Sequence, residues 1–267
     1  MTVLRFYGDR PPGVEGDELP GRLIVLEGTD GVGRSTHVRL LTEWLEARGY
    51  AVVNTGLRRS QLAGRGIERA MRGNTLDPLT LNLLYATDFW DRLERQILPA
   101  LRAGMVALVD RYVFSLMSRA IVRGLSREWL DNLFAFALVP DLVVYLDIDV
   151  EHLIPRVLAS TGFDYWESGQ DYLPGQDVFH SFVEHQTRLL TELRRQAHEH
   201  AFTIVDARQP IHEVFKSLCE AIEPVVSGMG GASGLPTGSS GRPELVWQVK
   251  QPVAPMPPAL DPGETRR

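Results

Sequence analysis

A short aliphatic run, LIVLE, is followed at once by the glycine-rich turn EGTDGVGRST and then by an amphipathic stretch that ends before Gly49. In the turn, Gly28, Gly33, Arg34 and Ser35 fill the GxxxxGK[ST] frame, with arginine in the place of lysine. A strand, loop and helix in this order bring backbone N–H groups and the positive end of the helix to one point, where they bind phosphate. The sequence therefore predicts a phosphate-binding loop, or P-loop, at the start of a parallel α/β domain.

The other residues of the P-loop have parts in the same prediction. Gly31 and Thr36 are expected to contact phosphate, and the Ser35 hydroxyl is expected to bind Mg²⁺. Arg34 keeps a permanent positive charge, but its planar guanidinium is bulkier than an ammonium group and places that charge differently. Binding of a triphosphate therefore tolerates this arginine better than catalysis does. The alternative is a chance glycine turn, and the order of strand, loop and helix argues against it.

Further aliphatic runs follow at intervals typical of a parallel sheet. With the first run, they predict strands at 23–27, 51–55, 105–110, 142–148 and 202–207. Amphipathic segments predict helices at 35–48, 79–102, 114–123, 127–137, 150–158, 178–200 and 211–225. Pro99 predicts a kink or break in the second helix. The alternation indicates an α/β fold of the P-loop NTPase type, a five-stranded parallel sheet with helices on both faces.

Composition divides the chain into an N-terminal extension at 1–20, a domain at 21–226 and a tail at 227–267. The extension is rich in Gly, Pro and acidic residues and is expected to lie against the domain without joining its core. The tail is rich in Gly, Ser and Pro, cannot supply a packed core, and is predicted to be disordered. Residues 159–176, an aromatic and acidic stretch interrupted by Gly and Pro, are expected to form a surface loop or lid.

Charge and cysteine content limit the class of protein. A net charge of −6 gives no basic footprint for nucleic acid, so small anionic ligands need local positive sites. No apolar run is long enough to span a bilayer, and the N-terminus lacks the hydrophobic stretch of a secretory signal. The one cysteine, Cys219, excludes an intrachain disulfide. We expect a cytoplasmic protein with no nucleic-acid partner and no membrane contact.

Asp110 and Arg111 end the third predicted strand. Because the carboxyl ends of parallel strands face the ligand crevice, Asp110 is predicted to reach a metal ion or its waters, and Arg111 a phosphate. The alternative is a salt-bridged pair at a strand end. On the second predicted helix, the charged residues from Asp88 to Arg95 have the i,i+3 and i,i+4 spacing of a solvated face and are expected on the surface.

With EGTDGVGRST, PDLVVYLDID and LVDRYVFS, the domain resembles the thymidylate kinase family of nucleoside monophosphate kinases, over about residues 22 to 225. The resemblance implies transfer of a phosphoryl group from ATP to dTMP, with Mg²⁺ as cofactor, in a homodimer. It implies catalytic roles for Arg34, Asp110 and Arg111. Ser35 and Asp110 are the implied metal ligands.

The resemblance also assigns the site of the monophosphate. Asp30 matches the acid that contacts the sugar hydroxyl, and Arg59 falls where the family holds the monophosphate. Arg111 matches a second phosphate-binding arginine, and Tyr85 matches the aromatic that stacks on thymine. Two alternatives stay open, because Arg58 could serve in place of Arg59 and Tyr85 could be a core residue of its helix.

Three residues depart from the family pattern. Arg34 replaces the catalytic lysine, Phe89 stands where an arginine usually reads the base edge, and Arg119 stands near an aromatic that senses the sugar. The lid sequence GFDYWESGQD has no arginine, which leaves Arg34, Arg123 and Arg156 to supply charge to the transferring phosphoryl group. Arg119 is therefore assigned to monophosphate binding and Arg156 to ATP binding.

Two other functions remain as alternatives. Arg34 and the arginine-free lid motivate a nucleotide-binding protein of this fold with little or no turnover. Phe89 motivates a kinase with a different monophosphate acceptor, because its ring cannot donate a hydrogen bond to a base.

Overall fold

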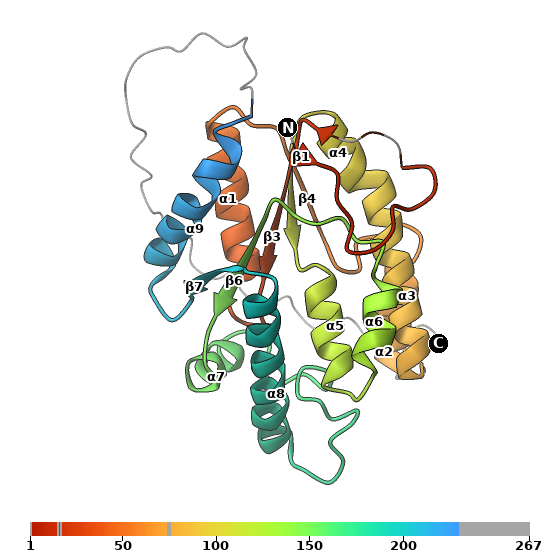
Figure 1. Ribbon diagram of the computed structural model, residues 1–267. Coiled ribbons are helices and arrows are strands. Elements are labelled where there is room, and N and C mark those ends of the chain that lie inside the picture. The colour runs from red at the N-terminus through yellow and green to blue at the C-terminus, as the bar shows by residue number, and fades with distance from the viewer. Residues whose placement is uncertain (1, 15, 17, 74–75, 230–267) are drawn as a thin grey trace, which may run out of the picture. The chain divides into compact units, whose positions relative to one another are not determined.

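The structure, a computed structural model, describes residues 2–14, 16, 18–73 and 76–229. Its centre is a parallel sheet of strands β3 (Arg22–Glu27), β4 (Val52–Gly56), β5 (Val106–Asp110), β6 (Leu142–Asp147) and β7 (Thr203–Asp206). The strand order is β4-β5-β3-β6-β7, with every neighbouring pair parallel (Figure 1). A separate antiparallel pair is formed by β1 (Thr2–Val3) and β2 (Glu18–Leu19). The predicted five-stranded parallel sheet is confirmed, with the strand before the P-loop in its middle.

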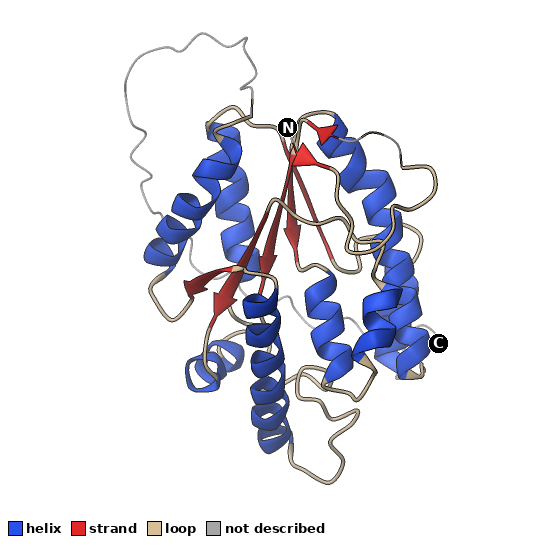
Figure 2. Ribbon diagram, in the orientation of Figure 1, coloured by secondary structure: helices blue, strands red, loops and turns tan. Residues whose placement is uncertain are grey.

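Helices cover both faces of this sheet, as predicted (Figure 2). Their bounds are α1 (Arg34–Ala47), α2 (Gly64–Gly73), α3 (Pro78–Arg92), the π-helical turn η1 (Leu93–Ile97), α4 (Leu98–Arg102), α5 (Val113–Ile121), α6 (Arg127–Leu133), α7 (Val150–Leu158), α8 (Val178–Glu199) and α9 (Ile211–Val226). One core cluster lies under α3, α4, α5 and α6, the other under α1, α7 and α9, and α8 contributes to both. Strand β3 alternates between them: Leu23 and Val25 join the first cluster, Ile24 and Leu26 the second.

Two of the predicted helices differ in detail, and one helix was missed. The segment predicted at 79–102 contains the π-helical turn η1 just before Pro99, which lies in the first turn of α4. A wider turn accommodates the proline, which lacks an N–H and crowds the carbonyl four residues earlier. The helix predicted at 127–137 ends at Leu133. The sequence does not predict α2 because its glycines lower helix propensity.

The N-terminal segment joins the core, so the expectation that residues 1–20 stay outside it is wrong. Leu4, Val14 and Leu19 are buried in the cluster under α3 to α6. Backbone hydrogen bonds also link the segment to the chain between α6 and β6. These apolar side chains are scattered among Gly, Pro and acidic residues, so average composition does not reveal them.

The other expectations about chain organisation have different outcomes. Residues 159–176, the lid segment, contain neither helix nor strand, which confirms the predicted loop. The predicted tail at 227–267 lies outside the described residues except for 227–229, of which Met229 is buried in the cluster under α9. Within the described ranges, no helix has the length and apolar character needed to cross a membrane.

Candidate functional site

The P-loop, which joins β3 to α1, has the backbone that its glycines predict. Gly28, Gly31 and Gly33 have φ angles of 147°, 77° and 105°, where side chains are disfavoured. A Cβ atom at Gly31 would lie 2.7 Å from Cγ2 of Val157, so that position also needs glycine for space. The loop leads directly into the N-terminus of α1, where N–H groups lack intrahelical partners and attract anions.

Two cavities lie against the P-loop. The inner cavity, of about 320 Å³, is lined by Asp30, Arg34, Ser35, Gly56, Leu57, Arg58, Arg59, Glu68, Asp110 and Arg111. The outer cavity, of about 550 Å³, is lined by residues that include Gly31, Gly33, Thr36, His37 and Arg156. Neighbouring residues of the loop thus line different cavities, so both cavities meet at the P-loop.

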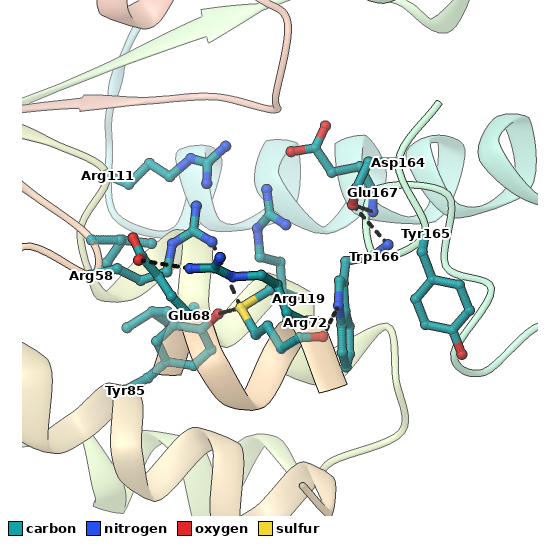
Figure 3. A pocket seen from close by; sticks show the side chains of 13 residues that line it. Arg58, Glu68, Arg72, Tyr85, Arg111, Arg119, Asp164, Tyr165, Trp166 and Glu167 are labelled. Carbon is teal, nitrogen blue, oxygen red and sulfur yellow. Dashed lines mark hydrogen bonds and ion pairs between the residues drawn. The ribbon is translucent and has the colours of Figure 1, made fainter. Parts of the chain in front are cut away.

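A third cavity, called here the large cavity, has a volume of about 750 Å³. It shares Leu57, Arg58, Glu68 and Arg111 with the inner cavity, so the two adjoin. Its remaining lining residues are Met71, Arg72, Tyr85, Leu116, Arg119, Asp164, Tyr165, Trp166 and Glu167. In Figure 3, Arg58, Arg111 and Arg119 face one space, with the ring of Tyr85 beside it and the ring of Tyr165 directed away.

Asp30 lies among positive charges. Its carboxylate forms ion pairs with Arg111 and Arg119 and a longer one, at 3.5 Å, with Nη2 of Arg34. These partners come from the end of β5, from α5 and from α1, so the fold brings together four residues that the sequence predicted separately. Asp110, which pairs with Arg34 at 2.8 Å, adds a second carboxylate. Two carboxylates do not neutralise three guanidinium groups, and the excess positive charge favours an anionic ligand.

Arg111 is held in an uncommon backbone conformation. Its φ angle is 69°, and its N–H donates to the Leu26 carbonyl at 3.0 Å. Burial, with a smaller effect of Arg119, lowers the pKa of Arg111 to about 9. The guanidinium is therefore still charged at neutral pH, and it lines both the inner and the large cavity.

Arg34 is bound to the P-loop and to β5. Its Nε donates to Oδ1 of Asp110 at 2.8 Å, and its Nη1 donates to the carbonyls of Gly28 and Thr29. The side chain is largely buried and lines the inner cavity beside Ser35. The predicted catalytic pair Arg34 and Asp110 is thus in direct contact.

The loop after β4 presents Arg58 and Arg59. Arg58, with φ of 61°, lines the inner and large cavities, whereas Arg59 lines the inner cavity and donates to Oδ1 of Asn54 at 2.9 Å. Arg58 and Arg59, the two candidates for binding the monophosphate, therefore both line the inner cavity. A Cβ atom at Gly64 would lie 2.3 Å from the Arg58 carbonyl oxygen, so α2 approaches this loop as closely as glycine allows.

Asp88 holds the same loop from α3. Its carboxylate accepts the N–H groups of Arg58 and Ser60, each at 3.1 Å, and Nε of Arg92 at 3.0 Å. Asp88, Asp91 and Arg92 are buried, so the expectation that this charge pattern lies on the surface is wrong for them. Helical spacing allows a polar face to meet either water or a polar loop, and only the tertiary structure distinguishes them.

The lid is tied to the helices around the large cavity. Arg123 donates to both oxygens of Asp171, at 2.7 and 3.0 Å, and to the Trp166 carbonyl at 2.9 Å. Nε1 of Trp166 donates to the Met71 carbonyl at 3.0 Å, and the Tyr85 hydroxyl to Sδ of Met71 at 3.1 Å. In this structure Arg123 therefore supports the lid, rather than standing in the cavity as Arg119 does.

Tyr85 satisfies both interpretations, since it lines the large cavity and packs against the core. Burial raises the pKa of its hydroxyl, so the ring is neutral. Phe89 is fully buried, with its ring centroid 4.8 Å from that of Tyr112, and is a core residue. Of the three residues that depart from the family pattern, Arg119 is the one that lines the large cavity.

The outer cavity offers fewer side-chain charges. Arg156 donates to the carbonyls of Val32 and Ala207, at 3.1 and 2.7 Å, so its guanidinium joins the P-loop to the end of β7. Burial, together with the nearby Arg156, lowers the pKa of His37 to about 4, which leaves the imidazole neutral at pH 7.

Several cavity residues were missed by sequence reasoning: Glu68, Met71, Arg72 and Glu167. The first three lie on α2, which the sequence does not predict, and Glu167 lies in a lid without regular structure. The charged pairs in GRGIERAMRG were the available signal, but they do not indicate which face meets a cavity.

Comparison with known proteins gives a consistent result. The family described as thymidylate kinase matches residues 26–218. A probable thymidylate kinase 2 of Saccharolobus solfataricus is 34% identical over 198 residues, which cover 73% of this chain and 92% of the relative. A probable thymidylate kinase of Thermococcus gammatolerans is 31% identical over 78% of this chain and 100% of the relative. A thymidylate kinase of Caldanaerobacter subterraneus subsp. tengcongensis is 31% identical over 79% of this chain and 99% of the relative.

Proposed function

The chain belongs to the thymidylate kinase family, and from this premise we propose that it transfers the γ-phosphoryl group of ATP to dTMP, giving ADP and dTDP. It is an ATP-dependent phosphotransferase. The observation that carries the assignment within this chain is the adjoining pair of cavities, where arginines surround Asp30 beside a P-loop. The predicted function of a divergent thymidylate kinase is thereby retained, and no contact among the described residues favours a protein without turnover.

The cavities suggest where each substrate lies. The large cavity has the aromatic ring of Tyr85 for the thymine base, and the adjoining inner cavity has the carboxylate of Asp30 for the sugar hydroxyl. Arg58, Arg59 and Arg111 line the inner cavity, where the acceptor phosphate would bind. The outer cavity, with Gly31, Gly33, Thr36 and Arg156, would hold the nucleoside part of ATP and its inner phosphates.

The residues present fit the expected Mg²⁺. Ser35 and Asp110 supply hard oxygen atoms and line the same inner cavity. Mg²⁺ commonly keeps several waters and binds one or two carboxylates together with phosphates, so a denser cluster of ligands is not required. When bound, the ion would neutralise charge on the phosphates. Arg34 already holds Oδ1 of Asp110, so it orients the carboxylate.

Catalysis then consists of positioning and charge neutralisation. The bond from the γ-phosphorus to the bridging oxygen of ATP breaks, and a bond from the γ-phosphorus to an oxygen of dTMP forms. The acceptor phosphate is already ionised, so no general base is needed. The guanidinium groups of Arg34 and Arg111 would stabilise the negative charge on the phosphoryl group as it moves from donor to acceptor.

A coupled assay with purified protein, ATP, Mg²⁺ and a panel of monophosphates tests the proposal. We expect ADP release to depend on dTMP, with smaller rates for dUMP, dCMP and dGMP. Nucleotide binding without turnover on any acceptor would contradict it. A preference for a purine monophosphate would instead overturn the assignment of the acceptor.

A homodimer and a cytoplasmic location, both expected from the sequence, complete the proposal. Helix α3 carries the exposed side chains of Leu79 and Leu83, one turn apart, and an exposed apolar pair of this kind suits an interface between copies. Light scattering on the parent and on Leu83→Asp tests this. A parent that elutes with the mass of one chain would exclude the homodimer.

A further inference from the structure

The carboxylate of Glu27 contacts the turn that carries Arg111. Glu27 is the last residue of β3, is fully buried, and immediately precedes Gly28 of the P-loop. Its Oε1 accepts the N–H groups of Tyr112 at 2.8 Å and Ser115 at 3.3 Å. Its Oε2 accepts the Ser115 hydroxyl. All of these donors lie where the chain passes from β5 into α5.

Glu27 thereby acts as a cap for α5 from a different element. Tyr112 occupies the N-cap position of α5, and its hydroxyl donates to the Leu138 carbonyl at 2.6 Å. The first N–H groups of a helix need acceptors, and a carboxylate is favoured there by the helix dipole and by charge-assisted hydrogen bonds. The Glu27 carboxylate supplies these interactions to Tyr112 and Ser115.

The same contacts fix the backbone of Arg111. A residue other than glycine with φ of 69° persists only where its surroundings hold it there. Consecutive residues of β3 hold consecutive N–H groups of the turn: the Leu26 carbonyl accepts that of Arg111, and the Glu27 carboxylate that of Tyr112. The end of β3 therefore determines the direction in which the Arg111 side chain leaves the turn.

That direction leads to the substrate site. Arg111 pairs with Asp30 of the P-loop and lines the inner and large cavities. Glu27, in contrast, has no accessible surface and lines none of these cavities. Its backbone continues into Gly28 of the P-loop, whereas its side chain holds the turn that carries Arg111, so a change in the side chain acts first on the turn.

We propose that Glu27 is a positioning residue for the acceptor phosphate, acting through the backbone of Arg111. The inference rests on the proposed function, in which Arg111 binds the phosphate of dTMP. A general structural role would weaken folding and affect both substrates alike. A positioning role affects dTMP and leaves the binding of triphosphate nearly unchanged.

Glu27→Gln is the central variant, because it keeps the size of the side chain but removes its negative charge and replaces Oε2, which accepts the Ser115 hydroxyl, with an N–H₂ donor. We expect the KM and Kd for dTMP to rise about tenfold, the scale of one lost charge-assisted contact. The Kd for a non-hydrolysable ATP analogue should stay within about twofold on the same scale. Equal losses for both ligands would overturn the proposal.

Ser118→Ala is the matched control. Ser118 is also buried on α5, and its Oγ accepts Nε2 of Gln196 at 2.9 Å, away from the turn. This variant should leave the KM for dTMP within about twofold, although it disturbs the same helix. A rise like that of Glu27→Gln would show that any change in α5 has this effect, and the proposal would fail.

A double-mutant cycle tests the route through Arg111. If Glu27 acts only by positioning Arg111, then adding Glu27→Gln to Arg111→Ala should raise the KM for dTMP by less than about twofold. Multiplied effects of the two substitutions would overturn the route. Should Glu27→Gln fail to fold, Ser115→Ala removes one of the contacts and is expected to raise the KM for dTMP about two- to threefold in the same cycle.

Amide hydrogen exchange of the ligand-free protein gives a readout that does not depend on the reaction. The Tyr112 and Ser115 amides should exchange faster in Glu27→Gln than in the parent and in Ser118→Ala. Unchanged exchange would overturn the proposal whatever the activity. Faster exchange in a protein whose parent does not phosphorylate dTMP would support the contact and refute the proposed function, so the two failures are distinguishable.

Discussion

The outer cavity and the arginine-lined cavities on the other side of the P-loop would bind phosphate by different means. At the outer cavity, Arg156 is hydrogen-bonded to backbone carbonyls, Arg208 is paired with Asp206, and His37 is neutral. The donors for a ligand are therefore mainly N–H groups of the loop and of α1. At the inner and large cavities, several guanidinium groups converge on Asp30.

The difference has a physical consequence. Backbone donors are fixed by the fold and survive most side-chain substitutions, whereas guanidinium groups depend on partners such as Asp30 to hold them. The loop that carries Arg58 depends in addition on the Asp88 carboxylate, which accepts the Arg58 N–H. The acceptor side should therefore be sensitive to single substitutions and the donor side resistant, except at Arg34, whose guanidinium binds both the P-loop carbonyls and Asp110.

The largest effect is expected at Arg34. Arg34→Ala removes the contacts with Asp110 and with two P-loop carbonyls, together with the positive charge that the proposed mechanism assigns to the transferring group. We expect kcat to fall by about 10³-fold or more and triphosphate binding to weaken. Arg34→Lys should keep or raise activity, because lysine is the common solution at this position.

Steady-state kinetics and ATP binding on both variants check this. An active parent with an inactive Arg34→Lys would show that the site has been built around arginine. The planar group would then be required for its simultaneous contacts with Asp110 and the loop.

The next effect sharpens the contrast between the two sides. Arg111→Ala should raise the KM for dTMP about 100-fold, as for loss of a charged, buried hydrogen-bonding group, while the Kd for an ATP analogue changes little. Arg39→Ala, on the exposed face of α1, is the control and should change neither. A comparable loss of ATP binding in Arg111→Ala would break the proposed division of the site.

The same contrast explains how far the sequence could be interpreted. The P-loop, the five strands and Asp110 could be predicted because each depends on a local pattern, a strand with glycines or with a polar end. The burial of Asp88 and Arg92 could not, because the same spacing suits a solvated face and the partner loop lies 28 to 30 residues away. The role of Glu27 could not be predicted either, because its partners Tyr112 and Ser115 come close to it only when β5 pairs with β3.

A smaller effect concerns the choice of base at the acceptor side. Tyr85→Ala should weaken binding of dTMP and dUMP alike, by about 1 to 3 kcal/mol, because stacking is largely indifferent to base identity. Arg119→Ala should reduce the preference for dTMP if this arginine supplies the hydrogen bond that Phe89 cannot. Measurements of kcat/KM for dTMP, dUMP, dCMP and dGMP on the parent and both variants test these two roles. A strong dTMP preference that survives Arg119→Ala would remove this residue as the base reader.

The smallest effect separates two buried histidines, His37 beside the outer cavity and His185 under the lid. Burial, reinforced by neighbouring arginines, lowers the pKa of His37 to about 4 and that of His185 to about 2, from about 6.5 in the unfolded chain. Below pH 6.5 the unfolded chain therefore binds protons that the folded chain does not, and stability is lost as the pH falls. Each residue should contribute about 1 kcal/mol of this loss between pH 7 and 5.5.

Urea unfolding of the parent, His37→Gln and His185→Gln over this range measures the contributions, because the loss assigned to a histidine disappears when that histidine is replaced. Both variants should flatten the profile equally above about pH 4. Below that pH, the loss due to His37 ends because its folded form also binds a proton, while the loss due to His185 continues. A parent whose stability is constant from pH 7 to 5.5 would show that both imidazoles take up protons in the folded state, and that the two sides of the site are less dry than their burial indicates.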